Sequence, residues 1–186
     1  MFVLSPKPRT VFLDRDGVIN EKMPEGIYVT QPSEFQLISG VAHAISLLNQ
    51  ANIRVIVVTN QRGIAKGLYD SSDLEKIHAS FQEQIRAHNA HVDAIFYCPH
   101  DKNECNCRKP LPGLFEQASS QFPDIEVSSC VMIGDSWSDI QFGNQLGMRT
   151  IFIEVNPERQ RPGAEKAREE ASYCCNSLSE AIDMLI

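Results

Sequence analysis

Short apolar runs alternate along the chain with longer segments in which apolar residues recur every three or four positions. The short runs are rich in Val, Ile and Phe, which is typical of parallel strands covered on both faces. The longer segments have the period of amphipathic helices. We therefore predict strands at Thr10–Leu13, Arg54–Val58, Ala94–Tyr97, Val131–Ile133 and Thr150–Ile153. Helices are predicted at Val41–Gln50, Ser72–Asn89, Pro112–Gln121, Trp137–Leu146 and Leu178–Leu185.

This alternation predicts an α/β fold, a doubly wound and mainly parallel sheet with right-handed crossovers. The 186 residues, 42% of them hydrophobic, suit a single domain spanning residues 1–186. Ser71 or Ser72 can cap the second helix, with Glu75 as the capping-box partner. Pro112 suits the first turn of the third helix. The longest irregular stretches, 33–40 and 102–111, are candidate substrate-shaping loops.

Charge and composition exclude several classes of partner. The formal net charge is −7 and no run of Lys and Arg occurs, which argues against a nucleic-acid surface. No apolar stretch approaches the roughly 20 residues of a membrane span. Met1–Arg9 has an apolar run of only three residues and is no secretory signal, so we expect a cytoplasmic protein. Since no apolar stripe is left over after the predicted core, we expect a monomer.

The first predicted strand leads directly into an acidic turn. Asp14 and Asp16 stand two residues apart at the end of this buried strand, and Gly17 allows a sharp turn after them. Ligands bind at the carboxyl edge of strands in open α/β sheets, and two carboxylates there are costly to keep charged without a cation. The pair indicates a divalent cation and an acid/base site. An Asp-Gly turn that merely ends the strand is the alternative for this segment alone.

Three later segments bear on that alternative. Thr59, Asn60 and Gln61 end the second strand and offer a hydroxyl and two amides to a phosphate oxygen. Arg108-Lys109 offers a bidentate guanidinium and a compact positive charge just before a helix. Each segment alone is also compatible with ordinary turn chemistry.

The third of these segments is a second acidic turn, after the fourth predicted strand. It carries Asp135 and, four residues on, Asp139. Asp135 can complete a magnesium site with Asp14, while Asp139 can bind the metal or orient its ligands. N-capping of the following helix is the alternative for one of the two carboxylates.

In the order Asp-x-Asp, Thr, Lys and Gly-Asp-x₃-Asp, these segments resemble the haloacid dehalogenase superfamily of phosphohydrolases, from about Val11 to Ile153. The resemblance implies a sheet in which the first strand lies between the second and the fourth. It also implies that Asp14 is the nucleophile of an aspartyl-phosphate mechanism and Asp16 the general acid/base. The implied Mg²⁺ ligands are Asp14, Asp135 and the backbone carbonyl of Asp16. Thr59 and Lys109 would hold the phosphate oxygens.

A second motif is Cys98-Pro99-His100-x₄-Cys105-Asn106-Cys107. Three thiolates and one imidazole suit a closed tetrahedral Zn²⁺ site, which is structural. Reduced surface cysteines beside a chance histidine are the alternative. We call residues 98–107 the zinc loop and expect it to be a local insertion. Because Cys107 directly precedes Arg108-Lys109, fixing this loop would also fix the phosphate-binding lysine.

The remaining cysteines and histidines carry no predicted chemistry. Cys130 begins an apolar run and is expected to be an inert core thiol. Cys174 and Cys175 are assigned no role. The remaining histidines are expected to lie on the surface or to be hydrogen-bonded within helices: His43, His78, His88 and His91.

The gaps between the motifs are too short for a large cap domain, so we expect an open site for a small phosphorylated metabolite. Substrate choice would fall to Glu25–Phe35, the zinc loop and Arg108. Two capless families resemble the chain here. The heptose 1,7-bisphosphate 7-phosphatases of lipopolysaccharide precursor synthesis are similar at residues 26–29, 59–67 and 96–100. The histidinol-phosphate phosphatases share the four-residue spacer between His100 and Cys105. We favour the heptose bisphosphate; a catalytically idle, zinc-stabilised binding module is the alternative of a different class.

Overall fold

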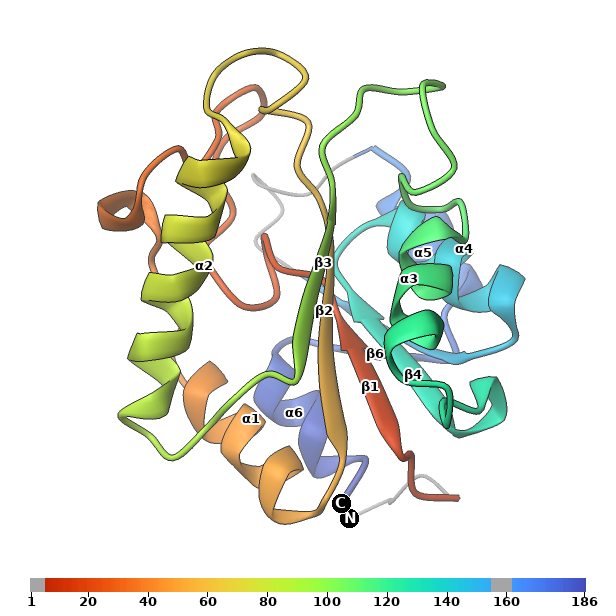
Figure 1. Cartoon of the computed structure of the whole chain (residues 1–186). Coiled ribbons are helices and arrows are strands. Elements are labelled where there is room, and N and C mark those ends of the chain that lie inside the picture. The colour runs from red at the N-terminus through yellow and green to blue at the C-terminus, as the bar shows by residue number, and fades with distance from the viewer. Residues whose placement is uncertain (1–5, 155–161) are drawn as a thin grey trace.

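The computed structural model describes residues 6–154 and 162–186. Its centre is a six-stranded parallel sheet in the order β3-β2-β1-β4-β5-β6 (Figure 1). The strands are β1 (Thr10–Leu13), β2 (Arg54–Asn60), β3 (Ala94–Cys98), β4 (Cys130–Gly134), β5 (Arg149–Ile153) and β6 (Tyr173–Cys175). The helices are α1 (Val41–Gln50), α2 (Ser71–Arg86), α3 (Gly113–Gln121), α4 (Trp137–Leu146), α5 (Ala164–Glu170) and α6 (Leu178–Asp183). Short 3₁₀ turns form at η1 (Pro32–Glu34) and η2 (Val127–Ser129).

Helices cover both faces of the sheet, which confirms the predicted doubly wound α/β fold. In Figure 1, α1, α2 and α6 lie on one side and α3, α4 and α5 on the other. The β1 side chains alternate between these layers: Val11 and Leu13 join the core cluster under α1, α2 and α6, whereas Phe12 joins that under α3 and α4. No part of residues 6–154 and 162–186 forms a large cap domain over the sheet.

The register of the central strands determines where the polar turns meet. Leu13, the last residue of β1, aligns with Val57 of β2 and with Ile133 of β4. Parallel strands in this register end at one edge of the sheet. The segments that follow β1, β2 and β4 therefore leave the sheet side by side.

Two elements near the C-terminus were not predicted. Helix α5 is a short segment with little apolar content, since Ala167 is its one buried residue among those described. Strand β6 has three residues and lies at the sheet edge beside β5. Its Cys175 is 2% exposed while Cys174 is exposed. This alternation is the sign of an edge strand, but three residues are too few to show it in the sequence.

Two predicted helix starts were wrong. The N-cap of α2 is Asp70, whose side chain accepts from the backbone N–H of Asp73 at 2.9 Å, while Asp73 returns the bond. The predicted serine caps lie inside the helix, because a carboxylate cap in the preceding position already satisfies its first N–H groups. Pro112 is the N-cap of α3 rather than a residue of its first turn.

No helix among the described residues is both long and apolar enough to cross a membrane. The prediction for Met1–Arg9 falls in part on residues 1–5, which lie outside the described residues.

Candidate active site

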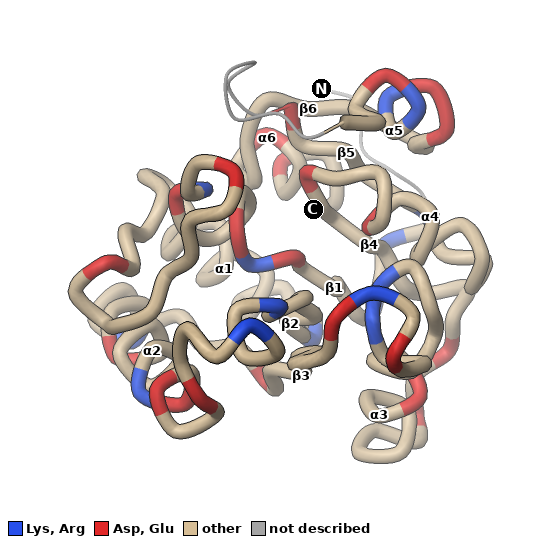
Figure 2. Tube along the Cα trace, turned by 90° about the horizontal axis from the view of Figure 1, so that it is seen from above, with Lys and Arg blue, Asp and Glu red and all other residues tan. Residues whose placement is uncertain are grey.

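The turns after β1, β2 and β4 gather polar side chains at one sheet edge. Asp14 follows β1 and its backbone N–H donates to the Ile133 carbonyl at 2.9 Å, so it continues the ladder with β4. Asp135 follows β4, and Thr59 lies at the end of β2. Figure 2 looks down on this edge, where acidic and basic segments lie close together beside β1, β2 and β3.

Three carboxylates share this edge. Each of Asp14, Asp135 and Asp139 offers an oxygen within 4.8 Å of the other two. Asp135 is 1% exposed and Asp139 is fully buried. Burial raises the pKa of Asp135 to about 7, and burial together with Asp139 raises the pKa of Asp14. Crowded, buried carboxylate oxygens are the donor set that a divalent cation takes, so the residues present fit Mg²⁺.

Gly17 makes the close approach to Asp135 possible. Its φ is 99°, in the left-handed region, and a Cβ at this position would overlap the Asp135 carboxylate. A residue with a side chain would therefore be strained and would push Asp135 away from Asp14.

Two buried lysines lie among these carboxylates. Lys109 Nζ is 2.9 Å from Asp14 Oδ1 and 2.6 Å from Asp139 Oδ1, and it donates to the Val58 carbonyl at 2.6 Å. Burial lowers the pKa of Lys109, but the two carboxylates outweigh burial and the net shift is upward. Lys109 is therefore charged at neutral pH.

Lys22 is the second lysine, and sequence reasoning missed it. Its side chain is 4% exposed and its Nζ forms an ion pair with Asp135 Oδ2. In the sequence it is one lysine in a polar loop, with no pattern that sets it apart. Its position in the fold alone places it at the carboxylate cluster.

Asp139 is engaged on both oxygens. Its Oδ2 accepts from the backbone N–H of Ser136 at 3.1 Å and from the Ser136 hydroxyl at 2.5 Å, while Oδ1 faces Lys109. Asp139 thus caps the start of α4 and orients Lys109. Of the two roles open to it in the sequence, orientation is the one that these contacts favour.

Asp16 is held by four N–H contacts. Arg15 Nη2 lies 2.9 and 3.0 Å from its two oxygens, and Asn20 and Gln61 each donate at 3.0 Å. Burial raises the pKa of Asp16, but Arg15 and the amides outweigh it and lower the pKa to about 2. The carboxylate is therefore ionised, with 23% of its side chain exposed.

The amides after β2 are engaged within the protein. Asn60 Oδ1 accepts from the backbone N–H of Lys109 at 3.0 Å, and Asn60 Nδ2 donates to its carbonyl at 3.2 Å. Gln61 donates to Thr59 Oγ1 at 2.7 Å as well as to Asp16 and accepts from the Tyr69 hydroxyl at 2.7 Å. Asn60 thus fixes Lys109, and Gln61 joins Thr59 to Asp16.

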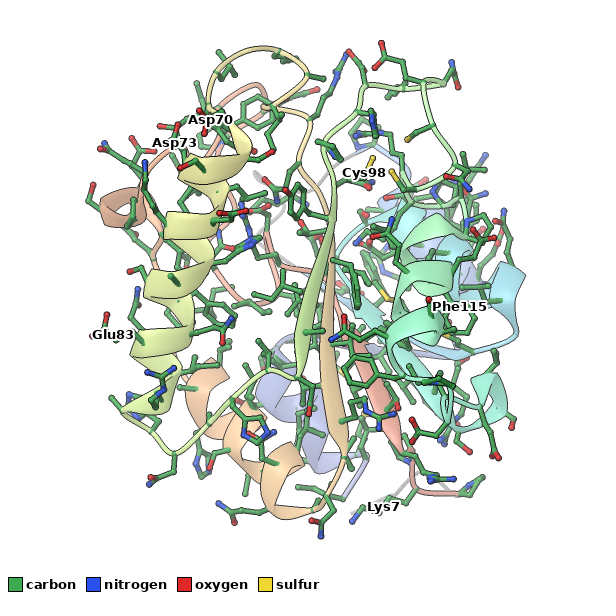
Figure 3. All side chains as sticks on the ribbon, viewed as in Figure 1. Lys7, Asp70, Asp73, Glu83, Cys98 and Phe115 are labelled. Carbon is green, nitrogen blue, oxygen red and sulfur yellow. The ribbon has the colours of Figure 1, made fainter. Side chains whose placement is uncertain are left out.

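The zinc loop brings its four candidate ligands together. Cys105 Sγ lies 3.5 Å from Cys98 Sγ and 3.4 Å from Cys107 Sγ, and His100 Nδ1 lies 3.8 and 3.4 Å from the outer two thiols. Ligands of a tetrahedral Zn²⁺ are spaced by about 3.4–3.8 Å, since Zn–S is about 2.3 Å. The donor set fits zinc. Figure 3 shows Cys98 at the upper end of β3, next to other sulfur atoms.

Loops around the edge are tied to one another. Arg62, after β2, forms an ion pair of 2.6 Å with Asp101 in the zinc loop. Lys66 lies 5.1 Å above the ring of Tyr28, in the predicted substrate loop 25–35. Arg108 donates to the His100 carbonyl at 3.2 Å. These contacts join loop 25–35, the segment after β2 and the zinc loop to one another.

A cavity of about 410 Å³ opens next to the turn after β1. Its lining includes Gly17, Lys22, Ile38, Ile153 and Glu154. Lys22, which pairs with Asp135, is thus one of the residues that border this cavity.

Comparisons with known proteins find relatives along nearly the whole chain. A family model described as HAD-hydrolase-like matches residues 106–181. A D-glycero-beta-D-manno-heptose-1,7-bisphosphate 7-phosphatase of Bordetella bronchiseptica is 32% identical over 179 residues, 96% of this chain and 98% of that protein. A D-glycero-alpha-D-manno-heptose-1,7-bisphosphate 7-phosphatase of Mycobacterium tuberculosis is 36% identical over 137 residues, 73% of this chain and 72% of that protein.

Solved structures show the same relationship. The crystal structure of D,D-heptose 1,7-bisphosphate phosphatase from B. bronchiseptica, complexed with magnesium and phosphate, superposes with a TM-score of 0.83 at 31% identity. The superposition covers 95% of this chain and 97% of that one.

Proposed function

Because this chain belongs to the haloacid dehalogenase-like hydrolases, we propose that it removes the 7-phosphate from D-glycero-D-manno-heptose 1,7-bisphosphate in a magnesium-dependent reaction. The observation that carries the proposal is the convergence of Asp14, Asp135 and Lys109 at one sheet edge. Relatives that span nearly the whole chain carry this activity in their names. One of these relatives was crystallised with magnesium and phosphate and superposes on this chain with a TM-score of 0.83, which supports a phosphate site in the same place here.

The reaction follows from the two carboxylates after β1. Asp14 attacks phosphorus, the bond to the sugar C7 oxygen breaks, and an aspartyl phosphate forms on Asp14. Asp16 donates a proton to the leaving alkoxide. It then takes a proton from water, which attacks the phosphorus, frees Asp14 and releases inorganic phosphate.

Asp16 must hold a proton for the first of these steps. With a pKa of about 2 it is ionised before substrate binds. A phosphate group bound beside it adds negative charge, which raises the pKa of the carboxyl group and makes its protonated form accessible. After the alkoxide has left, the ionised carboxylate is the state that activates water.

Mg²⁺ would be held by Asp14, Asp135 and the backbone carbonyl of Asp16. It supplies positive charge that screens the anionic nucleophile from the anionic phosphate. Lys109 and the Thr59 hydroxyl would hold the equatorial phosphate oxygens. Asp139 and Asn60 would keep Lys109 in place through the contacts described above.

Zinc would be held by the cysteine and histidine cluster of the zinc loop. With four protein ligands the site is closed, so its part is structural. Arg108, next to the loop, would contact the sugar end of the substrate together with loop 25–35.

Lys22 gives a prediction about metal binding. Its charge occupies Asp135, a proposed magnesium ligand, so a bound metal must displace it toward the adjacent cavity. Lys22→Met removes that competitor and is expected to tighten Mn²⁺ binding, followed by electron paramagnetic resonance, by about tenfold. The metal-free variant should melt below the wild type, because Asp135 loses its partner. Lys76→Met, on the surface of α2, is the matched control. Unchanged or weaker Mn²⁺ binding in Lys22→Met would contradict this role.

Histidinol phosphate is the second candidate substrate, on the strength of the four-residue spacer between His100 and Cys105. The named relatives favour the heptose bisphosphate. The test compares kcat/KM for both anomers of the heptose bisphosphate with kcat/KM for histidinol phosphate. We expect a preference of about 100-fold for a heptose anomer, which is about 2.7 kcal/mol of transition-state discrimination. A preference of that size for histidinol phosphate would reverse the assignment. Background rates on both, and on an aryl phosphate, would indicate the binding module.

A further inference from the structure

Arg15, between the two catalytic aspartates in sequence, is among the most buried charged residues. It is 1% exposed, and its guanidinium carbon lies 5.9 Å from the centre of the Phe35 ring. Nη2 contacts both oxygens of Asp16, and within the described residues Nε has no hydrogen-bond partner. Apart from Asp16 and the Phe35 ring, the group that fixes the direction of this guanidinium is therefore the partner of Nη1.

Nη1 is held by His78 of α2. Its distance to His78 Nε2 is 3.3 Å, across 63 residues of sequence. Arginine has no acceptor, so His78 must accept with an unprotonated Nε2, which leaves its proton on Nδ1. His78 is 7% exposed, and its ring packs edge-on against Tyr97 at 6.2 Å. Burial and the Arg15 charge lower the pKa of His78 to about 3, so the ring is neutral in the pH range of enzymes.

We propose that His78 is a positioning residue for the general acid/base: it fixes Arg15, and Arg15 aims the carboxylate of Asp16. The inference rests on the proposed phosphatase function. Without the acceptor, a buried guanidinium N–H is left unsatisfied, which costs free energy. The guanidinium then turns away from Asp16 to reach another acceptor. Asp16 would then lose two of its four N–H contacts and its fixed direction.

The expected signature is a loss in the chemical steps rather than in binding. Asp16 acts on the leaving oxygen and on water, whereas the phosphate is bound by other residues. His78→Leu, which replaces the imidazole by an apolar side chain of similar size, should lower kcat by about tenfold or more while KM changes by less than about threefold. His78→Gln places an amide oxygen where it can accept from Arg15, and should recover most of the lost kcat.

The experiment measures kcat and KM for the wild type, His78→Leu, His78→Gln and the exposed control His88→Leu. Each is tested on the heptose bisphosphate and on p-nitrophenyl phosphate. Water activation is common to both substrates, so the loss should appear with both. Loss with His78→Leu and recovery with His78→Gln supports the proposal. Wild-type kcat in His78→Leu, or equal losses in the Leu and Gln variants, overturns it.

Two further readouts separate positioning from general damage. Mn²⁺ affinity should be unchanged in both His78 variants, since neither touches a proposed metal ligand. Long-range ¹H–¹⁵N spectra of the wild-type imidazole should show Nε2 unprotonated at pH 6–8; a proton on Nε2 would overturn the inference. If the wild type cleaves only the aryl phosphate, the proposed substrate fails while the role of His78 is still tested.

Discussion

Asp14→Asn is expected to abolish phosphate release while the protein stays folded. The amide has the size of the carboxylate but is no nucleophile toward phosphorus. We expect kcat to fall by at least about a thousandfold, or about 4 kcal/mol of transition-state stabilisation. Burial and the nearby Asp139 raise the pKa of Asp14, so its charge is costly in the folded state. Its removal should therefore leave the melting temperature equal to or above that of the wild type.

The matched control is Asp124→Asn, which makes the same change on the surface, where Asp124 pairs with Arg54 at 3.0 Å. It should keep wild-type activity. Acid quenching during turnover of a ³²P-labelled aryl phosphate should trap label on the wild type and none on Asp14→Asn. Label on the Asn variant, or turnover near that of the wild type, would refute the nucleophile assignment.

Loss of zinc is expected to reduce stability and activity together. Cys105→Ser removes a proposed zinc ligand that is only half-buried, so the substitution itself disturbs little of the core. Three remaining ligands should not retain the metal, and the loop would lose about 2–3 kcal/mol of support. For a chain of this size we expect the melting temperature to fall by about 5–10 °C. The zinc content is measured by mass spectrometry on the same samples.

Activity should fall further than stability accounts for, because Lys109 lies two residues beyond Cys107, the last of the proposed zinc ligands. Mn²⁺ affinity should stay close to wild type, since none of the proposed magnesium ligands lies in this loop. Cys174→Ser, an exposed thiol outside the cluster, is the control. Full activity in Cys105→Ser with zinc verifiably absent would show that the loop does not position Lys109.

The sequence predicted the fold through periodicity and the site edge through motif order. Five strands and five helices appear close to their predicted positions, because buried parallel strands and amphipathic helices leave strong patterns. The prediction failed where the pattern is short, as in β6, or where two caps compete, as at Asp70. Carboxyl ends of adjacent parallel strands must share an edge, so Asp14 and Asp135 could be placed together before any coordinates.

What the sequence could not show are contacts made by side chains far apart in the chain. The ion pair of Lys22 with Asp135 spans 113 residues, and the hydrogen bond of Arg15 with His78 spans 63. A lone lysine in a loop and a lone histidine on a helix are common in any protein. Their significance depends on which buried group they meet, and no local pattern records that.

The contacts that join loop 25–35, the segment after β2 and the zinc loop have a consequence for altering specificity. Arg62 with Asp101 and Lys66 with Tyr28 couple segments that come from three different crossovers. Substitutions in one segment should then show epistasis with the other two. To make the protein accept another sugar phosphate, all three segments should be exchanged together. Exchanging one segment alone should lower activity, because it breaks that segment's contacts with the other two.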